Sequence, residues 1–170
     1  MSEETSAVDA FESNLLHGSS RLIADLTEFF RDYKLEDTIF AIYARGNTRN
    51  KGLFLSRFFA WTVLPNYHVA LFCVDEGKTL LSIDRLRTRI EIVTRVTDRD
   101  ELKWSWLVVF SDRALSPQIV SFVSRYDRKE LGLAIASTTS KQIVPSSNQV
   151  GRSIVKQLRL RKALGPNKLG

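Results

Sequence analysis

Two segments that are apolar on both sides of an extended backbone constrain the fold more than any other feature of this chain. Within residues 103–110, positions 104, 106, 108 and 110 are all apolar, and so are positions 107 and 109 between them. Residues 131–136 form a second apolar run. A strand of this kind needs a covering layer on each side, so both segments are expected to be central strands. Ser116 and Pro117 open a helix between them, and strand, helix and strand together predict a β-α-β unit with parallel strands.

Other patterns predict the elements on either side of this unit. Apolar residues at helical spacing favour helices, whereas alternation favours strands. The expected helices are 21–33, 53–64 and 149–163, and the expected strands are 38–43, 67–74, 79–83, 85–96 and 142–144. Residues 45–52 are expected to form a loop, and 67–83 a hairpin that turns at 75–78. The predicted fold class is therefore α/β, with a central mixed sheet flanked by helices and a basic C-terminal helix.

The composition fits a single domain. A chain of 170 residues with 44% hydrophobic content can bury about two-thirds of its unfolded surface. We expect a flexible acidic N-terminus over 1–18, one α/β domain over 19–164 and a flexible tail over 165–170. The single cysteine, Cys73, lies in an apolar run, which predicts a buried thiol and excludes an internal disulfide and a zinc site built on thiolates.

No targeting or membrane-spanning segment is expected. The first ten residues are polar and acidic, which is the reverse of a secretory signal. No stretch approaches the roughly 18 uninterrupted apolar residues that a bilayer span needs. The sequence therefore predicts a soluble, cytoplasmic protein without a membrane partner.

Positive charge is concentrated in the C-terminal part of the chain. The net charge is +6, residues 1–37 contain nine acids and three bases, and residues 131–170 contain seven bases and no acid. This asymmetry favours a directed electrostatic surface and a polyanionic partner, although an ordinary solvated basic face gives the same counts.

Three sets of cations are candidate nucleic-acid contacts. Arg85, Arg87 and Arg89 alternate along a segment expected to be extended, which would project all three guanidinium groups from one face toward phosphates. The second set lies in the expected loop and the third on the expected last helix. These further candidates are Arg45, Arg49 and Lys51 in the loop, and Arg152, Lys156, Arg159, Arg161 and Lys162 in the helix.

Few residues offer catalytic chemistry. His17 and His68 are the two histidines, and neither lies in a pattern typical of a nucleophilic triad. No glycine-rich phosphate-binding loop is present. Trp104 and Trp106 are expected to pack in the core rather than stack on bases, because they share a strand face with apolar residues. We therefore expect no catalytic residue and no cofactor.

The segment from 107–112 through the following helix to 131–135 resembles part of a known family. It is similar to the strand, serine, short loop, helix and strand that follow the active-site hairpin in the restriction-endonuclease-like PD-(D/E)XK superfamily, which includes archaeal Holliday-junction resolvases and Mrr-type nucleases. The whole expected order of helix, hairpin, strand, helix and strand from residue 53 onward resembles the core of this superfamily. That resemblance covers about half of the chain and implies a restriction-endonuclease-like core.

The resemblance also implies which residues of this chain occupy the family's metal-binding positions. In the family, an Asp on one hairpin strand and an (Asp/Glu)-X-Lys on the next hold Mg²⁺. On the expected hairpin these positions read His68 and Ser82-Ile83-Asp84, which implies a nuclease-like scaffold without the catalytic metal site. The alternative is a site rebuilt from other carboxylates, for which the candidates are Asp75, Glu76, Asp84 and Glu91.

The first functional hypothesis is a nucleic-acid-binding protein, with DNA as the expected partner and no bound metal. One alternative is a metal-dependent nuclease with relocated carboxylates, in which Mg²⁺ would be the cofactor. Another is a protein-interaction subunit of a nucleoprotein complex. A protein partner or a homodimer is compatible with each of these hypotheses.

Overall fold

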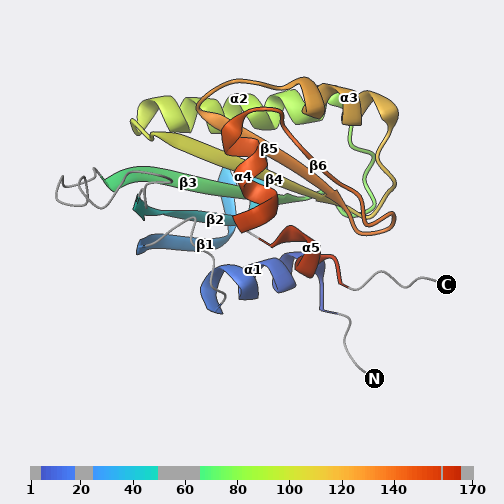
Figure 1. Ribbon diagram of the computed structural model, residues 1–170, viewed down its shortest axis with the longest axis horizontal. Helices are drawn as coiled ribbons and strands as arrows, with labels where there is room; N and C mark the ends of the chain where they lie inside the picture. Colours follow the sequence, from blue (N-terminus) through green and yellow to red (C-terminus); the bar gives the residue numbers. More distant parts are fainter. Residues whose placement is uncertain (1–4, 18–24, 50–65, 158, 166–170) are drawn as a thin grey trace, which may run out of the picture.

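The computed structural model describes residues 5–17, 25–49, 66–157 and 159–165 (Figure 1). Its elements in chain order are α1 (Ala7–His17), β1 (Asp25–Leu35), β2 (Thr38–Arg49), β3 (Asn66–Asp75), α2 (Ile83–Arg99), β4 (Trp104–Ser111), α3 (Pro117–Arg125), β5 (Leu131–Ser137), β6 (Ile143–Pro145), α4 (Gln149–Gln157) and α5 (Leu160–Ala163). The six strands within these residues form one sheet, in the order β1-β2-β3-β4-β5-β6. The predicted α/β class, a mixed sheet flanked by helices, is confirmed.

The sheet combines an antiparallel meander with a parallel section. β1, β2 and β3 pair antiparallel, β3, β4 and β5 pair parallel, and β6 returns antiparallel to β5. In the central pair Leu107 lies opposite Leu133, and Val108 lies opposite Ala134. The predicted β-α-β unit is therefore confirmed, with α3 as its crossover helix.

Helices cover both faces of the sheet (Figure 1). α2 and α3 share one buried cluster with Leu107 and Val109 of β4. α1, α4 and α5 share the other with Trp106 and Val108 of the same strand. Alternate residues of β4 therefore pack into two separate cores, one on each face of the sheet, as the apolar residues on both sides of this segment indicated.

The expectations for Cys73 and the two tryptophans are also confirmed. Cys73 on β3 is fully buried, and this burial raises the pKa of its thiol. Trp104 and Trp106 pack in the second cluster with their rings edge to face, 6.1 Å apart between centroids. Core packing therefore accounts for both rings.

The expected helix over 21–33 is wrong where the structure describes it, because residues 25–35 form the edge strand β1. The apolar positions 26, 29, 30 and 33 fit a helical spacing, but the same segment is rich in aromatic residues that pack well on a sheet. Hydrogen-bonded pairing with β2 over most of the length of β1 selects the strand over the helix. β2 itself continues to Arg49, so residues 45–49 are strand rather than loop.

The second half of the expected hairpin is also wrong. Residues 79–82 form no strand, and 83–99 form the helix α2 instead of an extended segment. The Ser82 side chain caps the helix by accepting a hydrogen bond from the N–H of Arg85. Leu86, Ile90 and Val93 then follow at helical spacing on the buried side. β3 pairs with β2, so the antiparallel hairpin precedes residue 75 rather than following it.

Both ends of the chain differ from expectation. The N-terminal segment contains the helix α1, which buries Val8 and Phe11. The basic C-terminal helix is divided into α4 and α5, with Arg159 between them in the left-handed region at φ 49°. The expected helix 53–64 and the loop residues 50–52 lie outside the described residues.

None of the helices within the described ranges combines the length and the apolar character that crossing a bilayer requires.

Candidate nucleic-acid interface

The three arginines at 85, 87 and 89 do not share a face, because they lie on a helix and not on a strand. Arg85 and Arg89 both point toward Glu76, which follows β3 and has a side chain only 2% exposed. An Nη2 of Arg85 lies 2.7 Å from Oε2 of Glu76, and Nε of Arg89 lies 2.7 Å from its Oε1. The expectation that all three guanidinium groups project from one face of an extended segment is therefore wrong.

The cluster around Glu76 joins three elements. Arg89 also donates from Nη1 to the Thr38 hydroxyl at the start of β2, over 3.3 Å. Glu76 is anchored in turn by its own N–H, which donates to the carbonyl of Phe110 on β4. Charge-assisted hydrogen bonds of this kind are short and directional, and a buried carboxylate needs such partners. Arg85 and Arg89 therefore hold the start of α2 against the sheet.

Arg87 lies on another side of α2 and faces α3. Its guanidinium carbon lies 5.7 Å from the centre of the Phe122 ring, which is a cation–π contact. Its nearest carboxylate is Asp84 at 3.8 Å, with side chains 61% and 94% exposed for the arginine and the aspartate. An exposed pair at this distance contributes little, so Arg87 stays open to solvent.

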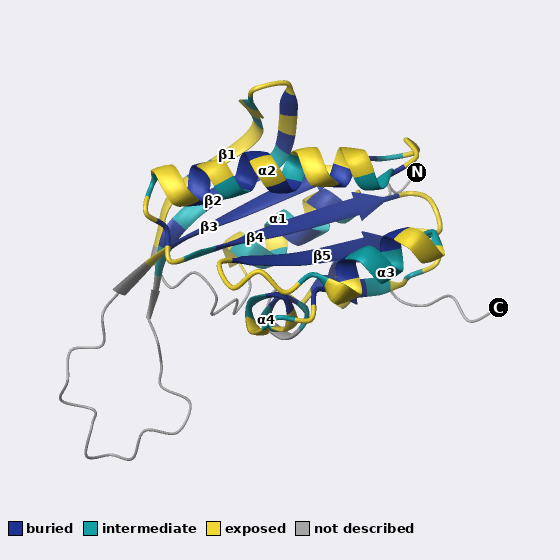
Figure 2. Ribbon diagram, turned by 90° about the horizontal axis from the view of Figure 1, so that it is seen from above, coloured by how far each residue is buried: buried dark blue, intermediate teal, exposed yellow. Residues whose placement is uncertain are grey.

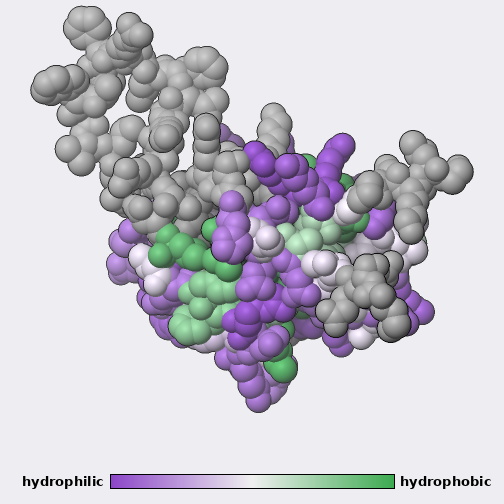
Figure 3. All heavy atoms as spheres, turned by 90° about the horizontal axis from the view of Figure 1, so that it is seen from below, coloured by the Kyte–Doolittle hydropathy of each residue, from purple (hydrophilic) through white to green (hydrophobic). Residues whose placement is uncertain are grey.

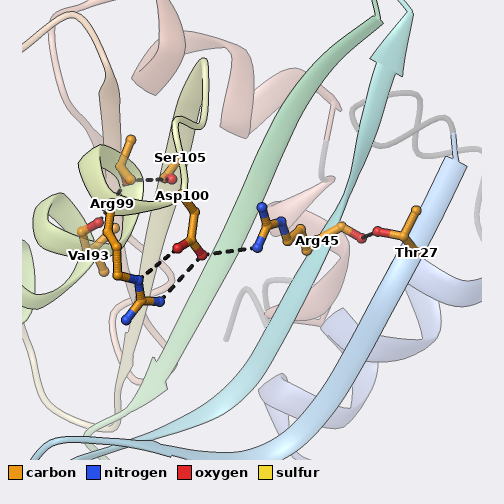
Figure 4. A network of polar contacts seen from close by, with 7 residues as sticks. Thr27, Arg45, Val93, Arg99, Asp100 and Ser105 are labelled. Atoms are coloured by element: carbon orange, nitrogen blue, oxygen red, sulfur yellow. Dashed lines mark hydrogen bonds and ion pairs between the residues drawn. The ribbon is translucent and has the colours of Figure 1, made fainter.

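Arg45 is also paired with a carboxylate. It lies on β2, and its Nη1 is 3.0 Å from an oxygen of Asp100 at the end of α2 (Figure 4). Asp100 accepts a second bond from Nε of Arg99 at 2.7 Å. Arg99 first and Arg45 next lower the pKa of Asp100 against the opposing effect of its burial. The side chain of Arg49 and all of Lys51 lie outside the described residues.

The C-terminal cations behave differently. Arg152 on α4 is exposed, and its Nε donates to the carbonyl of Ser147 at 2.8 Å. Arg161 and Lys162 on α5 are exposed as well. Within the described residues none of these three side chains forms an ion pair with a carboxylate. Arg159 is exposed between the helices, and the side chain of Lys156 is not described.

Tight packing fixes α4 on the sheet. Asn148 caps the helix, since its Oδ1 accepts from the N–H of Gly151 at 2.6 Å while its Nδ2 donates to the carbonyl of Leu131 at 2.6 Å. A Cβ on Gly132 would lie 2.7 Å from the backbone of Gly151, so only glycine allows this approach. Trp106 on β4 donates to Ser153 over 3.4 Å. The cations of α4 therefore stand on a rigid support.

α5 is attached by apolar side chains. Leu160, Ala163 and Leu164 are buried in the second cluster, where the helix also meets α1. Lys141, from the turn after β5, donates to the carbonyl of Leu164. Among the described residues on the underside, hydrophilic side chains make up most of the surface around a smaller hydrophobic area (Figure 3). Arg161 and Lys162 remain exposed on the solvent side of this helix.

The candidate metal ligands do not form a metal site. Asp75 binds the N–H of Gly77, Glu76 is held by two arginines, and Asp84 and Glu91 are exposed on α2. The described residues contain no group of three or more His, Cys, Asp or Glu that could hold a metal ion. The described positions of these carboxylates do not fit the Mg²⁺ of the alternative in which the metal site is rebuilt.

The corrected hairpin reveals a motif that the sequence analysis missed. Because β2 and β3 form the hairpin, the residues that follow its second strand read Glu76-Gly77-Lys78, which has the form (Asp/Glu)-X-Lys. The expected alignment through residues 82–84 is wrong, since those residues begin a helix. Arg85 and Arg89 nevertheless bind the two carboxylate oxygens of Glu76. The three residues therefore match the motif in sequence, but the carboxylate is not open to a metal ion.

No protein-family model, curated protein or solved structure matches this chain.

Proposed function

We propose that the protein binds nucleic acid, with DNA as the expected partner, through the exposed cations of α4 and α5. The observation that carries this proposal is the contrast in pairing. Arg152, Arg161 and Lys162 have no carboxylate partner within the described residues, whereas Arg45, Arg85 and Arg89 each lie within about 3 Å of one. Unpaired, exposed cations are available to phosphate oxygens without first losing an internal ion pair.

Electrostatic attraction to the phosphate backbone is the expected source of affinity. Residues 131–170 contain seven bases and no acid, so no carboxylate of this segment repels an approaching polyanion. Guanidinium groups match phosphate oxygens in geometry and stay charged at all relevant pH values. Contacts of this kind position a protein on nucleic acid but carry no sequence information. We expect binding with little base preference and a strong dependence on salt.

A nuclease-like scaffold without a catalytic metal remains part of the proposal. The succession β4, α3 and β5 with parallel strands supports it, because the closest part of the resemblance lies there, whereas the hairpin expected before it is replaced by β3 and α2. The resemblance at residues 107–112 and 131–135 falls on β4 and β5. The poor fit of the candidate carboxylates to Mg²⁺ favours binding without cleavage.

Fluorescence anisotropy with a labelled duplex tests the proposed function. We expect micromolar or tighter binding at low salt, with log K falling by about 0.9 per neutralised phosphate as log salt rises. The triple variant Arg152→Glu, Arg161→Glu and Lys162→Glu is expected to weaken binding by about tenfold or more. Absence of micromolar binding by the unmodified protein at low salt would overturn the proposal.

A matched control separates the surface from the overall charge. The variant Lys34→Glu, Lys78→Glu and Lys129→Glu changes the net charge by the same amount at exposed lysines elsewhere. We expect its affinity to fall by no more than about threefold, through the long-range field alone. Equal losses in the two variants would mean that α4 and α5 are not the binding surface.

Two further assays distinguish the alternatives. Incubation of plasmid, branched and single-stranded DNA with Mg²⁺ or Mn²⁺ is expected to give no cleavage, and cleavage that is lost in Asp75→Asn would establish a nuclease. Co-purification followed by nuclease treatment distinguishes a protein partner from nucleic acid. A complex that survives this treatment, together with no DNA binding, would favour an interaction subunit.

A further inference from the structure

The carboxyl ends of β4 and β5 lie next to each other at one edge of the sheet. Ser111 and Ser137 form the last parallel pair of the two strands. Residues 105–111 and all of β5 are buried, whereas the loop after β4 is exposed at 112–114 and the turn after β5 at 139–140 (Figure 2). Exposed loops that a rigid sheet holds in place are a common position for binding residues.

Hydrogen bonds fix the loop after β4 against the turn after β5. The N–H of Arg113 donates to Oγ of Ser111 over 3.2 Å, and the carbonyl of Arg113 accepts from Oγ of Ser137 at 2.8 Å. The N–H of Thr138 donates to the carbonyl of Ser111 at 2.8 Å. The backbone of Arg113 is therefore held at both of its polar groups, which gives its side chain a defined starting point.

The same turn is attached to the end of α5. The N–H of Ser140 donates to Oγ of Ser137 at 3.0 Å, and Nζ of Lys141 donates to the carbonyl of Leu164, the residue that follows α5. A continuous series of neighbouring and hydrogen-bonded residues thus leads from the exposed cations of α5 through this turn to Arg113. The loop, the turn and the helix form one connected surface.

The cations along this surface have no carboxylate partner. Arg113 is exposed and makes no ion pair with another described residue, and the ammonium group of Lys141 binds a neutral carbonyl. The turn 138–141 contains no acid. Arg113 and Lys141 therefore share with the described cations of α5 the property on which the proposed function depends.

Two acids mark the limit of this surface on the side of β3. The N–H of Asp112 donates to the carbonyl of Gly77 at 2.8 Å, and the N–H of Gly77 donates to Asp75 at 2.9 Å. Both carboxylates are exposed, and that of Asp112 accepts from the Thr138 hydroxyl at 2.7 Å. Their charge repels a polyanion, so the cationic surface ends between Asp112 and Arg113.

We propose that the nucleic-acid interface continues from α5 across the turn after β5 and ends at Arg113, whose guanidinium group binds a backbone phosphate. This inference rests on the proposed function. The guanidinium group matches phosphate oxygens in geometry, and the exposed Ser140 lies between Arg113 and α5 with a hydroxyl of the kind that also contacts phosphates. Asp112 opposes the contact, so its charge weakens binding.

The salt dependence of duplex binding tests the role of Arg113. Each phosphate contact contributes about 0.9 to the slope of log K against log salt. Arg113→Gln is expected to lower the slope by about this amount. The matched control is Arg125→Gln, which removes an exposed arginine without an ion pair from the other end of α3 and is expected to leave the slope unchanged. An unchanged slope in Arg113→Gln, or equal changes in both variants, would overturn the inference.

Removal of the opposing charge gives a second test, with the opposite sign. Asp112→Asn keeps an oxygen that accepts from Thr138 and is expected to strengthen duplex binding by about twofold or more at low salt. A variant that merely damaged the fold would not gain affinity. The control Glu91→Gln changes an exposed acid of α2, on the opposite face of the sheet from α5, and is expected to have no effect. Unchanged or weaker binding by Asp112→Asn would contradict the inference.

The same titrations distinguish this inference from the proposed function. If the unmodified protein does not bind the duplex at low salt, the proposed function fails and the inference fails with it. If the duplex binds and the α4 and α5 triple variant weakens it, but the amide resonances of Arg113 and Ser140 do not shift on its addition, the inference alone is wrong. We expect both resonances to shift.

Discussion

The cations of α2 and those of α4 and α5 illustrate two different uses of positive charge within one chain. The paired arginines of α2, each with a carboxylate oxygen within 2.7 Å, are Arg85, Arg89, Arg95 and Arg99. The exposed cations of α4 and α5 without an ion pair in the described residues are Arg152, Arg161 and Lys162. The first set is paired with carboxylates of the fold, and the second set is available for contacts outside it.

The distribution of acids along the chain explains the difference. Residues 1–37 contain nine acids, and the strands and turns around α2 supply Glu36, Glu76 and Asp100 as partners. Residues 131–170 contain none. The number of arginines in a segment therefore says less about binding than the number of carboxylates that the fold brings beside them.

Replacement of Glu76 by Gln is expected to have the largest effect on stability. The variant leaves Arg85 and Arg89 facing a neutral amide in a site where the native carboxylate is 2% exposed. Loss of one partner from a buried ion pair typically costs about 3 kcal/mol or more. Urea unfolding monitored by tryptophan fluorescence measures the change.

The matched control is Asp84→Asn on the same helix. Asp84 is 94% exposed and 3.8 Å from Arg87, so its loss is expected to cost less than about 0.5 kcal/mol. If both variants lose the same free energy of unfolding, the distinction between structural and open cations on α2 is wrong.

The sequence predicted the second half of the sheet well. β4, α3 and β5 were expected within one or two residues of their bounds, and their parallel pairing followed from the β-α-β order. Apolar residues on both sides of the strands leave only a central position, and Ser116 with Pro117 begins the helix unambiguously. Here local propensity and tertiary packing favour the same structure.

The region before β4 could not be predicted in the same way. The alternation of Arg85, Leu86 and Arg87 favours a strand, but residues 83–99 are far longer than an ordinary strand and Ser82 is a helix cap. For β1 the sequence fits both structures, and only pairing with β2 decides between them. A single sequence does not reveal which partner strand is available.

The candidate site could be predicted only in part. The acid-free C-terminal segment was visible in the sequence, and the structure leaves Arg152, Arg161 and Lys162 of this segment exposed. The role of Glu76 was not visible, because its two arginine partners were assigned to a strand. The correct assignment of α2 would have placed Arg85 and Arg89 one turn apart on one side of the helix, which is the spacing for a shared carboxylate.

Replacement of Asp100 by Asn is expected to have an intermediate and pH-dependent effect. Arg99 and then Arg45 lower the pKa of Asp100 in the folded protein. The stabilisation is therefore present above the ordinary carboxyl pKa near 4 and is lost as the pH falls through the lowered value. We expect Asp100→Asn to cost about 1 kcal/mol at neutral pH and progressively less as the pH falls below about 4.

Thermal unfolding of both proteins over this pH range measures the effect. Asp98→Asn is the control, because Asp98 is 63% exposed and lies 3.7 Å from Arg128. The control is expected to show almost no pH-dependent difference from the unmodified protein. A difference for Asp100→Asn that does not shrink as the pH falls below about 4 would contradict the assignment of Asp100 as the paired carboxylate.

Replacement of Arg87 by Ala is expected to have the smallest effect on stability, and this sharpens the comparison within one helix. Arg87 makes an exposed cation–π contact at 5.7 Å and a long ion pair, which together contribute about 0.5 kcal/mol or less. Arg89, two residues away and 13% exposed, binds both Glu76 and Thr38. If urea unfolding shows a loss for Arg87→Ala as large as that for Arg89→Ala, Arg87 is a structural residue and the contrast within α2 disappears. If the loss is small, Arg87 is a solvated side chain that the fold does not require, whereas Arg89 on the same helix is part of the structure.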